Sequence, residues 1–413
     1  MRPDTGGSLP PPSSCPPLAG PRSDPAGPTG RGGEGRAAEG RRYAQVVFNI
    51  PLNQTFDYAV PEALAGLLKV GCRVRAPFGP RHVIGYCVGL VAQPGVQEVK
   101  AIEAVVDPEP LLSAELLDLA RWLADYYLAG LGEVLEAILP SAVRLKVGVE
   151  ETVEVRLAVA AEEARAAMER FPKRVQKRAR LLEALINRGS RAEEKALLTE
   201  AGCGAAVVTA LRKAGLVVRE RVEREEPLAY PRVRKRPPYT LNPEQARAMA
   251  QVEAIRRAGT FGVLLLFGVT GSGKTEVYLQ AIAKVVAEGK QAIVLVPEIS
   301  LTPQTIARFR ERFDRVAVLH SHLAAGERAR YWRSIQRGEA QVVVGARSAI
   351  FAPTAHLGLI VIDEEHETSF KQETSPRYHA RDVAIMRAHH AGIPVILGSA
   401  TPTLESYHNR VLG

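Results

Sequence analysis

Apolar and polar positions follow a repeating pattern over the second half of the chain. Short runs rich in Val, Ile and Leu alternate with longer stretches whose apolar residues recur at helical spacing. This alternation predicts a parallel sheet with helices on both faces. We therefore expect a multidomain α/β protein in which residues 231–413 form one lobe. The expected strands of that lobe are residues 263–267, 292–296, 316–319, 341–344, 359–362 and 395–397.

The first part of the chain carries other patterns. Residues 1–42 are rich in Pro and Gly and have almost no large apolar side chains, so a disordered tail is expected there. Residues 43–147 have the spacing of short strands and turns, followed by a helix that Ser113 would cap. A small β-rich domain is predicted, with strands at residues 45–50, 72–76 and 83–88.

A third pattern occupies residues 148–230. Three short helix-like stretches precede an extended segment, and this order favours a winged helix whose third helix would approach a nucleic-acid groove. A spacer domain with a solvated charged face explains the pattern equally well, because no base-reading residue can be singled out. The helices are expected at residues 174–188, 191–200 and 205–213, and the extended segment at 216–222.

Composition and charge narrow the class of protein. The chain has 413 residues, of which 46% are hydrophobic and 24% charged, as in soluble globular proteins. No apolar run is long enough to cross a bilayer, so no membrane partner is expected. The net charge of +9 favours an anionic partner, nucleic acid foremost. The spacing of the cysteines predicts neither a structural zinc nor a disulfide framework in this chain, which fits a reducing cytoplasm.

Residues 268–275 form the sequence G-V-T-G-S-G-K-T directly after an expected strand. Backbone N–H groups of such a loop close on phosphates, and the helix that follows turns its positive end toward the anion. Lys274 would supply a charge for the β- and γ-phosphates, and Thr275 a hydroxyl ligand for Mg²⁺. The alternative is a glycine turn without a ligand. The candidate nucleotide-binding residues are Gly268, Val269, Thr270, Gly271, Ser272, Gly273, Lys274 and Thr275.

A second candidate site follows the apolar run at 357–362, which ends in D-E-E-H. Asp363 at the tip of a strand beside a phosphate loop can bind Mg²⁺. Glu364 then stands where a general base could polarise the attacking water. The alternative is an acidic helix start that complements the helix dipole. Lys274, Asp363 and Glu364 are the candidate catalytic residues, and Thr275 and Asp363 the candidate magnesium ligands.

Two weaker motifs flank these sites. Gln245, upstream of the phosphate loop, could read adenine through its amide, although Asn242 and Pro243 also make a normal helix start. Ser399 and Thr401, in the sequence G-S-A-T-P after a strand, could hydrogen-bond the acids of the second site. An ordinary strand-to-helix turn is equally consistent with that sequence. With His366, they are the candidate coupling residues.

The motifs G-V-T-G-S-G-K-T, D-E-E-H and G-S-A-T-P follow one another in this order along the chain. Together they resemble the first motor lobe of superfamily-two helicases, which has a RecA-like fold. Residues 296–304, 345–348, 369–372 and 376–381, together with 54–58 and 72–79 upstream, make the chain similar from residue 43 onward to the primosomal protein N′ (PriA-type) family. The resemblance implies an ATP-dependent 3′-to-5′ DNA helicase of replication restart. Such a protein uses ATP and Mg²⁺, recognises stalled forks, initiates primosome assembly, and is cytoplasmic and associated with the nucleoid.

The resemblance also implies DNA contacts. A pocket for the 3′ end of a nascent strand would be formed by Phe56, Asp57, Gly79 and Lys100, although Phe56 could equally be a core aromatic. An aromatic loop that senses single-stranded DNA would stack bases and couple DNA to ATP hydrolysis, or would be packed only for structure. The residues implied there are Arg347, Phe370, Lys371, Arg377 and Tyr378.

The chain also departs from the family pattern. It stops soon after Thr401, without the second motor lobe, whose arginine stabilises the transition state of ATP cleavage. The zinc-binding cysteines of the family lie beyond this point, so zinc is expected only in the missing part. Forked and single-stranded DNA, single-strand-binding protein and primosome components are the implied partners. The alternatives are a truncated fork-binding and loading module that binds DNA and ATP without unwinding, and a nucleotide-dependent remodeller of RNA or protein.

Overall fold

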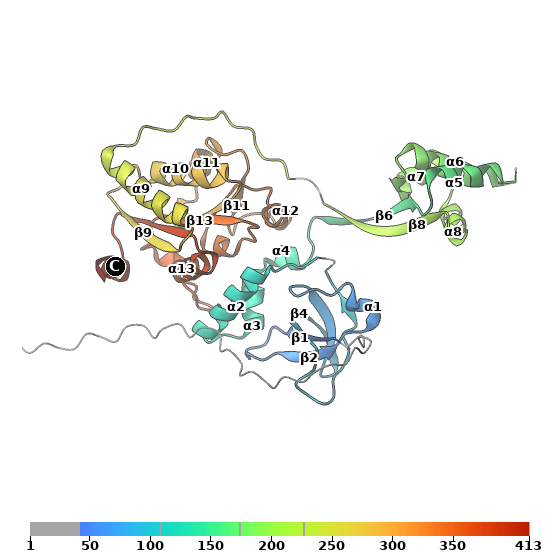
Figure 1. Ribbon diagram of the computed structural model, residues 1–413, viewed down its shortest axis with the longest axis horizontal. Coiled ribbons are helices and arrows are strands. Elements are labelled where there is room, and N and C mark those ends of the chain that lie inside the picture. The colour runs from blue at the N-terminus through green and yellow to red at the C-terminus, as the bar shows by residue number, and fades with distance from the viewer. Residues whose placement is uncertain (1–41, 108, 173–174, 226–227, 413) are drawn as a thin grey trace, which may run out of the picture. The chain divides into compact units, whose positions relative to one another are not determined.

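The computed structural model describes residues 42–107, 109–172, 175–225 and 228–412. These residues form three β-sheets with five, three and six strands (Figure 1). All but one of the residues in the expected tail at 1–42 lie outside the described part of the chain. None of the described helices is both long enough and apolar enough to cross a membrane.

The first sheet is antiparallel, with the strand order β2-β1-β4-β3-β5. It confirms the β-rich pattern near the start, although the first strand ends at Val47 because the next residues turn back on themselves through the Ile50 to Phe48 backbone bond of 2.8 Å. The strands are β1 (Tyr43–Val47), β2 (Phe56–Ala59), β3 (Arg73–Phe78), β4 (Arg81–Val91) and β5 (Ala104–Val105), with the short helix α1 (Glu62–Ala65) after β2.

Three helices follow this sheet, α2 (Ala114–Tyr126), α3 (Leu131–Ile138) and α4 (Ser141–Arg144). Ser113 caps α2 as expected, because its hydroxyl accepts a 3.3 Å hydrogen bond from the Leu116 amide. The apolar residues of α2 and α3 are buried in the same cluster as those of two helices of the carboxyl-terminal lobe, α12 (Ala325–Gln336) and α13 (Ala380–Ala391). These helices therefore share a core with that lobe.

The second sheet has the order β7-β6-β8 and carries its own core. Residues 191–193 were expected to begin a helix, but they pair with β6, so the helix starts only at Glu194. The long strand β6 was not expected, since its alternating charged and apolar residues resemble a polar surface stretch. The strands are β6 (Val149–Leu157), β7 (Arg191–Glu193) and β8 (Val217–Glu225), and the helices are α5 (Ala161–Glu169), α6 (Gln176–Asn187), α7 (Glu194–Ala201) and α8 (Ala205–Lys213).

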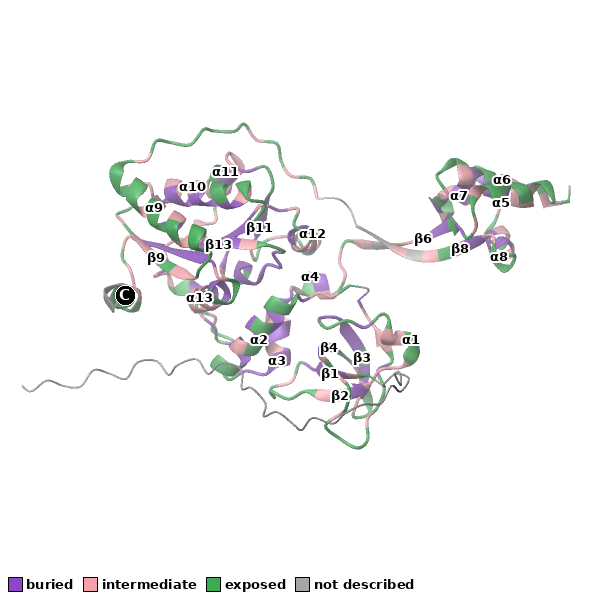
Figure 2. Cartoon of the chain, viewed as in Figure 1, coloured by how far each residue is buried: buried purple, intermediate pink, exposed green. Residues whose placement is uncertain are grey.

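The third sheet is parallel, with the order β11-β12-β10-β13-β14-β9, and contains all six strands expected from the sequence. Alternate strand residues enter opposite cores: Val294 packs with α10, whereas Ile293 packs with α12 and α13. Figure 2 shows β13, in the middle of this sheet, as buried. The strands are β9 (Gly262–Phe267), β10 (Gln291–Leu295), β11 (Val316–Leu319), β12 (Val342–Gly345), β13 (Leu357–Ile362) and β14 (Pro394–Ser399).

The remaining helices of this lobe connect the strands and place the motifs at the carboxyl edge of the sheet, where parallel sheets bind ligands. They are α9 (Pro243–Ala258), α10 (Lys274–Ala287), α11 (Pro303–Arg310) and α14 (Leu404–Leu412), with the 3₁₀ turns η2 (Glu298–Ser300), η3 (Arg347–Phe351) and η4 (Thr368–Phe370).

Candidate nucleotide site and nucleic-acid interface

The Gly-rich loop joins the end of β9 to the start of α10, as the sequence predicts. Gly271 and Gly273 have φ angles of 81° and 83°, in the left-handed region that side chains disfavour. Gly273 caps α10, and a Cβ at that position would collide with the amide nitrogen of Gln245. The two glycines thus leave the helix N-terminus open, with its backbone N–H groups available to an anion.

Lys274 lies between this loop and residues 363–366 after β13, which form the acidic segment of the site. Its side chain is buried, and its ammonium group donates a 2.7 Å hydrogen bond to the Gly268 carbonyl oxygen. The same nitrogen is 4.0 Å from a carboxylate oxygen of Glu364. The predicted phosphate-binding lysine and the predicted general base are therefore neighbours.

Asp363 follows β13 directly and is held from two sides. Its backbone N–H donates to the Leu295 carbonyl oxygen at the end of β10, at 2.9 Å, and the Tyr278 hydroxyl donates to its Oδ1 at 3.1 Å. Tyr278 and Thr275 are both on α10, three residues apart, a rise of about 4.5 Å. Asp363 is thus bonded to the helix that carries Thr275, and the two residues offer a carboxylate and a hydroxyl, a donor set that suits Mg²⁺.

Burial raises the pKa of Asp363 above its ordinary value, and the neighbouring charge of Glu364 adds to the increase. The folded-state pKa therefore lies above the unfolded one, so that ionised Asp363 lowers stability at neutral pH. This cost begins to shrink as the pH falls through the folded pKa, and it vanishes below the unfolded pKa. A bound divalent cation would favour the ionised form and offset the cost.

Asp363→Asn is therefore expected to raise the free energy of unfolding at neutral pH while it weakens magnesium binding. The gain should shrink as the pH is lowered and vanish once Asp363 is protonated in both the folded and the unfolded wild type. Urea unfolding at a series of pH values measures this. A variant less stable than the wild type at neutral pH would contradict the assignment of the burial effect.

Glu364 has a left-handed backbone with a φ of 49°, which is uncommon for a residue with a side chain. Backbone of this kind persists where the surrounding structure imposes it, and it occurs often at functional sites. Its carboxylate is 3.6 Å from Nδ1 of His366 in addition to its contact with Lys274. The geometry places Glu364 between two nitrogen-bearing side chains, where it can orient a water molecule.

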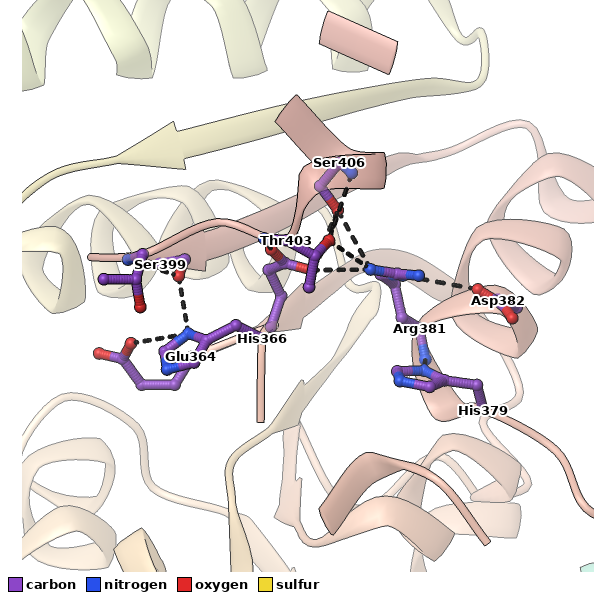
Figure 3. Close-up of polar contacts among 10 residues, drawn as sticks. Glu364, His366, His379, Arg381, Asp382, Ser399, Thr403 and Ser406 are labelled. Atoms are coloured by element: carbon purple, nitrogen blue, oxygen red, sulfur yellow. Dashed lines mark hydrogen bonds and ion pairs between the residues drawn. The ribbon is translucent and has the colours of Figure 1, made fainter. Parts of the chain in front are cut away.

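His366 connects the acidic segment to the tip of β14 (Figure 3). Its Nδ1 is 2.8 Å from the Ser399 hydroxyl, and that hydroxyl also accepts a 3.0 Å hydrogen bond from the Thr401 backbone N–H. The structure thus brings together the three residues expected to act in coupling, although Thr401 takes part through its backbone.

The sequence reasoning missed a buried network around Glu365. This residue is 0% exposed, and its carboxylate pairs with Arg381 at 3.1 Å and accepts hydrogen bonds from the Thr403 backbone N–H and the Ser406 hydroxyl. Figure 3 shows Arg381 reaching from α13 toward Thr403 and Ser406. The middle acid of D-E-E-H therefore anchors α13 and α14. A second acid next to Glu364 was visible in the sequence, but its partner was not.

Gln245 is held against the phosphate loop. Its Nε2 donates to the Ser272 carbonyl oxygen at 2.9 Å, and its Oε1 accepts from the Asn242 backbone N–H at 2.9 Å. The helix start at Asn242 is also present, because the Asn242 side chain accepts a hydrogen bond from the Gln245 backbone N–H at 2.8 Å. Both sequence interpretations of this motif are therefore compatible with the structure. Gln245, Ser272 and Lys274 line a cavity of about 1160 Å³.

Phe370 and Tyr378, which were expected to stack on DNA, have buried rings in this structure. The two residues are only 1% and 2% exposed and belong to the core cluster of the lobe. The Tyr378 ring packs 5.1 Å from Phe351, and Arg347 donates to the carbonyl oxygens of Ser369 and Lys371 at 3.4 and 2.5 Å. These contacts hold the loop in place. Its two rings are packed in the core, as the alternative interpretation of a loop packed for structure expects.

Removal of the Phe370 ring would consequently cost about 3–5 kcal/mol of stability and would report on packing before it reports on DNA. Lys371 and Arg377 remain exposed on the same loop and stay candidate phosphate contacts. Arg347 lies 5.9 Å from the centre of the Tyr378 ring and mainly positions the loop.

The residues expected to hold a 3′ end lie around β2 and the turn between β3 and β4. Phe56 is half-buried with its ring 5.7 Å from Phe48 and 5.2 Å from Phe78, so much of it is core, as the alternative interpretation required. The Asp57 carboxylate accepts a 2.6 Å hydrogen bond from the Gly95 amide. Gly79 has a φ of 59° in an open turn, and the Lys100 carbonyl oxygen accepts from the Ala59 amide at 2.9 Å.

Two family models match separate parts of the chain. Residues 45–140 match the family model "PriA_3primeBD: 3'DNA-binding domain (3'BD)", and residues 242–409 match "DEAD/DEAH box helicase". The "Replication restart protein PriA" of Bacillus subtilis is 38% identical to the chain over an alignment 434 positions long, gaps included, which covers 88% of the chain and 54% of that protein. The chain is similar to PriA proteins over most of its own length.

Other PriA relatives give the same result. The proteins of Chlamydia pneumoniae and Haemophilus influenzae are 35% and 38% identical, over 90% and 89% of the chain and 50% of each relative. The chain thus spans about half the length of the curated relatives it matches. A solved structure, the UvsW helicase from bacteriophage T4, is 15% identical with a TM-score of 0.28, covering 38% of this chain and 52% of that one. The likeness to PriA proteins depends on the sequence matches.

Gly398 offers a test of the contact between α10 and the acidic segment. A Cβ at this position would collide with the Tyr278 hydroxyl oxygen and approach Asp363 Oδ1 to 3.4 Å. Gly398→Ala should therefore displace Tyr278 and lower the free energy of unfolding by about 1–3 kcal/mol. It should also weaken nucleotide binding in the presence of Mg²⁺.

The double variant Gly398→Ala/Tyr278→Phe serves as the control, because it removes the atom that the new methyl group would meet first. It should recover part of the stability lost in the single variant when both are measured by urea unfolding. Wild-type stability of Gly398→Ala would show that the two elements do not pack as described.

Proposed function

We propose that the chain binds ATP with Mg²⁺ between the Gly-rich loop and the acidic segment, as the first motor lobe of an ATP-dependent 3′-to-5′ DNA helicase of replication restart. The observation that supports this most is the meeting of the two motifs: the Tyr278 hydroxyl reaches Asp363 at 3.1 Å, and Lys274 reaches Glu364 at 4.0 Å. Mg²⁺, when bound, would neutralise charge on the β- and γ-phosphates.

In this proposal each residue of the site has a defined task. Lys274 and the loop amides hold the phosphates, Thr275 and Asp363 hold the cation, and Glu364 orients the attacking water. Gln245 contacts the adenine. His366 and Ser399 report the state of Glu364 to β14, because their hydrogen bond is only 2.8 Å long.

The DNA side of the proposal is recognition of stalled forks through a nascent 3′ end. It is supported by the match of residues 45–140 to a 3′ DNA-binding domain and by the grouping of Phe56, Asp57, Gly79 and Lys100 around β2. Asp57 accepts a hydrogen bond from the Gly95 amide. It would therefore act by holding the loop that contains Gly95 against the DNA end. The order of α6, α7, α8 and the β6–β8 ribbon supports a winged helix between the two matched regions.

Further parts of the proposal have the resemblance as their only support. They are the initiation of primosome assembly, a single-strand-binding protein and primosome components as partners, and a cytoplasmic, nucleoid-associated location. The same holds for a zinc site in the part of the relatives that this chain does not span.

A fork-binding and loading module that does not unwind DNA is the second candidate. The described residues contain one six-stranded parallel sheet, whereas ATP cleavage in such motors uses an arginine supplied by a second element. Loss of such an arginine lowers the rate about 10³- to 10⁵-fold. The purified chain is therefore expected to bind ATP and forked DNA but to hydrolyse ATP feebly.

One experiment tests these proposals together. Binding of a labelled fork that ends in a 3′ hydroxyl is compared with binding of the same fork ending in a 3′ phosphate, alongside ATPase and unwinding assays. We expect tighter binding of the hydroxyl end, and loss of that preference in Asp57→Ala. Equal binding of both ends would refute 3′-end recognition, and robust unwinding by the chain alone would refute the loading module.

A further inference from the structure

Three aromatic rings meet at the carboxyl end of α2, outside the contacts considered so far. Trp122 and Tyr126 are stacked, with centroids 5.0 Å apart and planes inclined by 19°. Tyr127 is nearly perpendicular to both, at 4.9 Å from Tyr126 and 6.2 Å from Trp122. The three centroids form a triangle that is close to right-angled at Tyr126. Tyr127 therefore lies beside the stack, and neither ring covers the outer face of Tyr126.

Tyr126 is 61% exposed, and Leu128, two residues further on, is 93% exposed. Leu128 also has a left-handed backbone, with a φ of 52°. Burial favours apolar side chains, so a large aromatic ring and a leucine side by side in solvent, at a turn with uncommon backbone, form an unusual surface.

This surface is fixed to the loop that precedes α13. The Tyr127 hydroxyl accepts a 3.1 Å hydrogen bond from the His379 backbone N–H and donates one of 3.2 Å to Asp382. The Lys371 ammonium group is 5.4 Å from the centre of the Tyr127 ring. Tyr126 is thus held next to a segment whose own rings, Phe370 and Tyr378, are buried and cannot stack on a base.

A groove runs along the same loop. It has a volume of about 1140 Å³, and Arg347, Lys371 and His379 line one side of it, with the segment from α3 to α4 on another. The groove lining contains three acidic residues, Glu136, Glu298 and Glu373, and Glu136 is paired with Arg144. Next to the groove, Asp382 accepts a hydrogen bond from Tyr127, and Asp125 accepts one from Asn53 at 3.1 Å. The cations of the groove suit a phosphate backbone. Tyr126 does not line the groove itself but is connected to the Lys371 and His379 end through Tyr127.

We propose that Tyr126, supported from behind by Trp122, is a base-stacking platform for single-stranded DNA that follows this groove. The proposal deepens the function proposed above and depends on the lobe binding single-stranded DNA. Every base has a π-face, so the contact would tolerate any sequence. Because Trp122 already fixes the Tyr126 ring, little side-chain freedom is lost when a base stacks on it.

The test is the binding of a labelled single-stranded oligothymidylate, followed by fluorescence anisotropy, over a series of salt concentrations. Tyr126→Ala should weaken binding about 5- to 150-fold, the range that corresponds to the loss of one stacked base. Its dependence on salt should stay that of the wild type, because no phosphate contact is lost. Tyr126→Phe keeps the ring and should bind as the wild type does.

Two further variants separate this proposal from the function on which it depends. Tyr239→Ala removes another exposed ring, 66% accessible, and should leave binding unchanged. Lys371→Ala should weaken binding and reduce the slope of the salt dependence by about one. If Tyr126→Ala binds like the wild type while Lys371→Ala is weakened, the platform is refuted and DNA binding by the lobe stands. If the wild type does not bind the oligonucleotide, the proposed function itself fails.

Discussion

Arg381→Leu is expected to lower the free energy of unfolding by about 3–5 kcal/mol, the usual cost of leaving a buried charge without its partner. Glu365 is 0% exposed, and Arg381 is its cation at 3.1 Å. The hydrogen bonds from Thr403 and Ser406 remain in the variant and hold the carboxylate in place without neutralising it. Urea unfolding measures the loss.

Two controls define what this result means. Arg188→Leu breaks an exposed pair of similar length, 2.7 Å to Glu200, and should cost less than about 1 kcal/mol. The double variant Glu365→Gln/Arg381→Leu removes both charges and should be more stable than Arg381→Leu alone. A loss for Arg381→Leu no larger than that of the exposed control would mean that Glu365 is not the buried anchor of α13 and α14.

The second large effect is expected at Lys274. Lys274→Met keeps the aliphatic stem but removes the ammonium group that would contact the phosphates. A charged hydrogen bond contributes about 1.5–3 kcal/mol, so ATP affinity should fall by about 10- to 150-fold. The variant should fold, since the methionine can occupy the same buried position between the loop and Glu364.

Titration with a fluorescent ATP analogue measures the affinity. Lys284→Met is the matched control, because Lys284 lies on the same helix with an exposed side chain and should leave the affinity unchanged. Equal affinities for Lys274→Met and the wild type would remove the Gly-rich loop from the account of nucleotide binding.

The sequence predicted those parts of the lobe whose signals are local. The six parallel strands are apolar runs bounded by helices, and Gly271 and Gly273 stand where the loop needs a left-handed backbone. The approach of Asp363 to α10 could also be anticipated, because both follow strands that end at the same edge of one sheet.

The errors occurred where distant contacts decide the structure. Phe370 and Tyr378 lie in a polar, loop-like sequence, and only their packing on Phe351 and the hydrogen bonds from Arg347 bury them. Residues 191–193 have no strand signal of their own and become a strand through pairing with β6. The pairing of Glu365 with Arg381 likewise depends on how α13 folds back onto the acidic segment.

For the rings of Trp122 and Tyr126, the sequence predicts the contact between them but not their exposure. Their spacing of four residues on one helix predicts that they touch, but not that Tyr126 remains exposed. That exposure depends on Tyr127, which takes the contacts with His379 and Asp382 and leaves Tyr126 outside.

The central claim is that the phosphate loop and the acidic segment form one site, and magnesium linkage tests it most directly. The affinity for the ATP analogue is measured with and without Mg²⁺ in the wild type and in Asp363→Asn. The account predicts that Mg²⁺ tightens binding in the wild type and has a much smaller effect in the variant, while both bind similarly without the metal. An equal response to Mg²⁺ in the two proteins would contradict it.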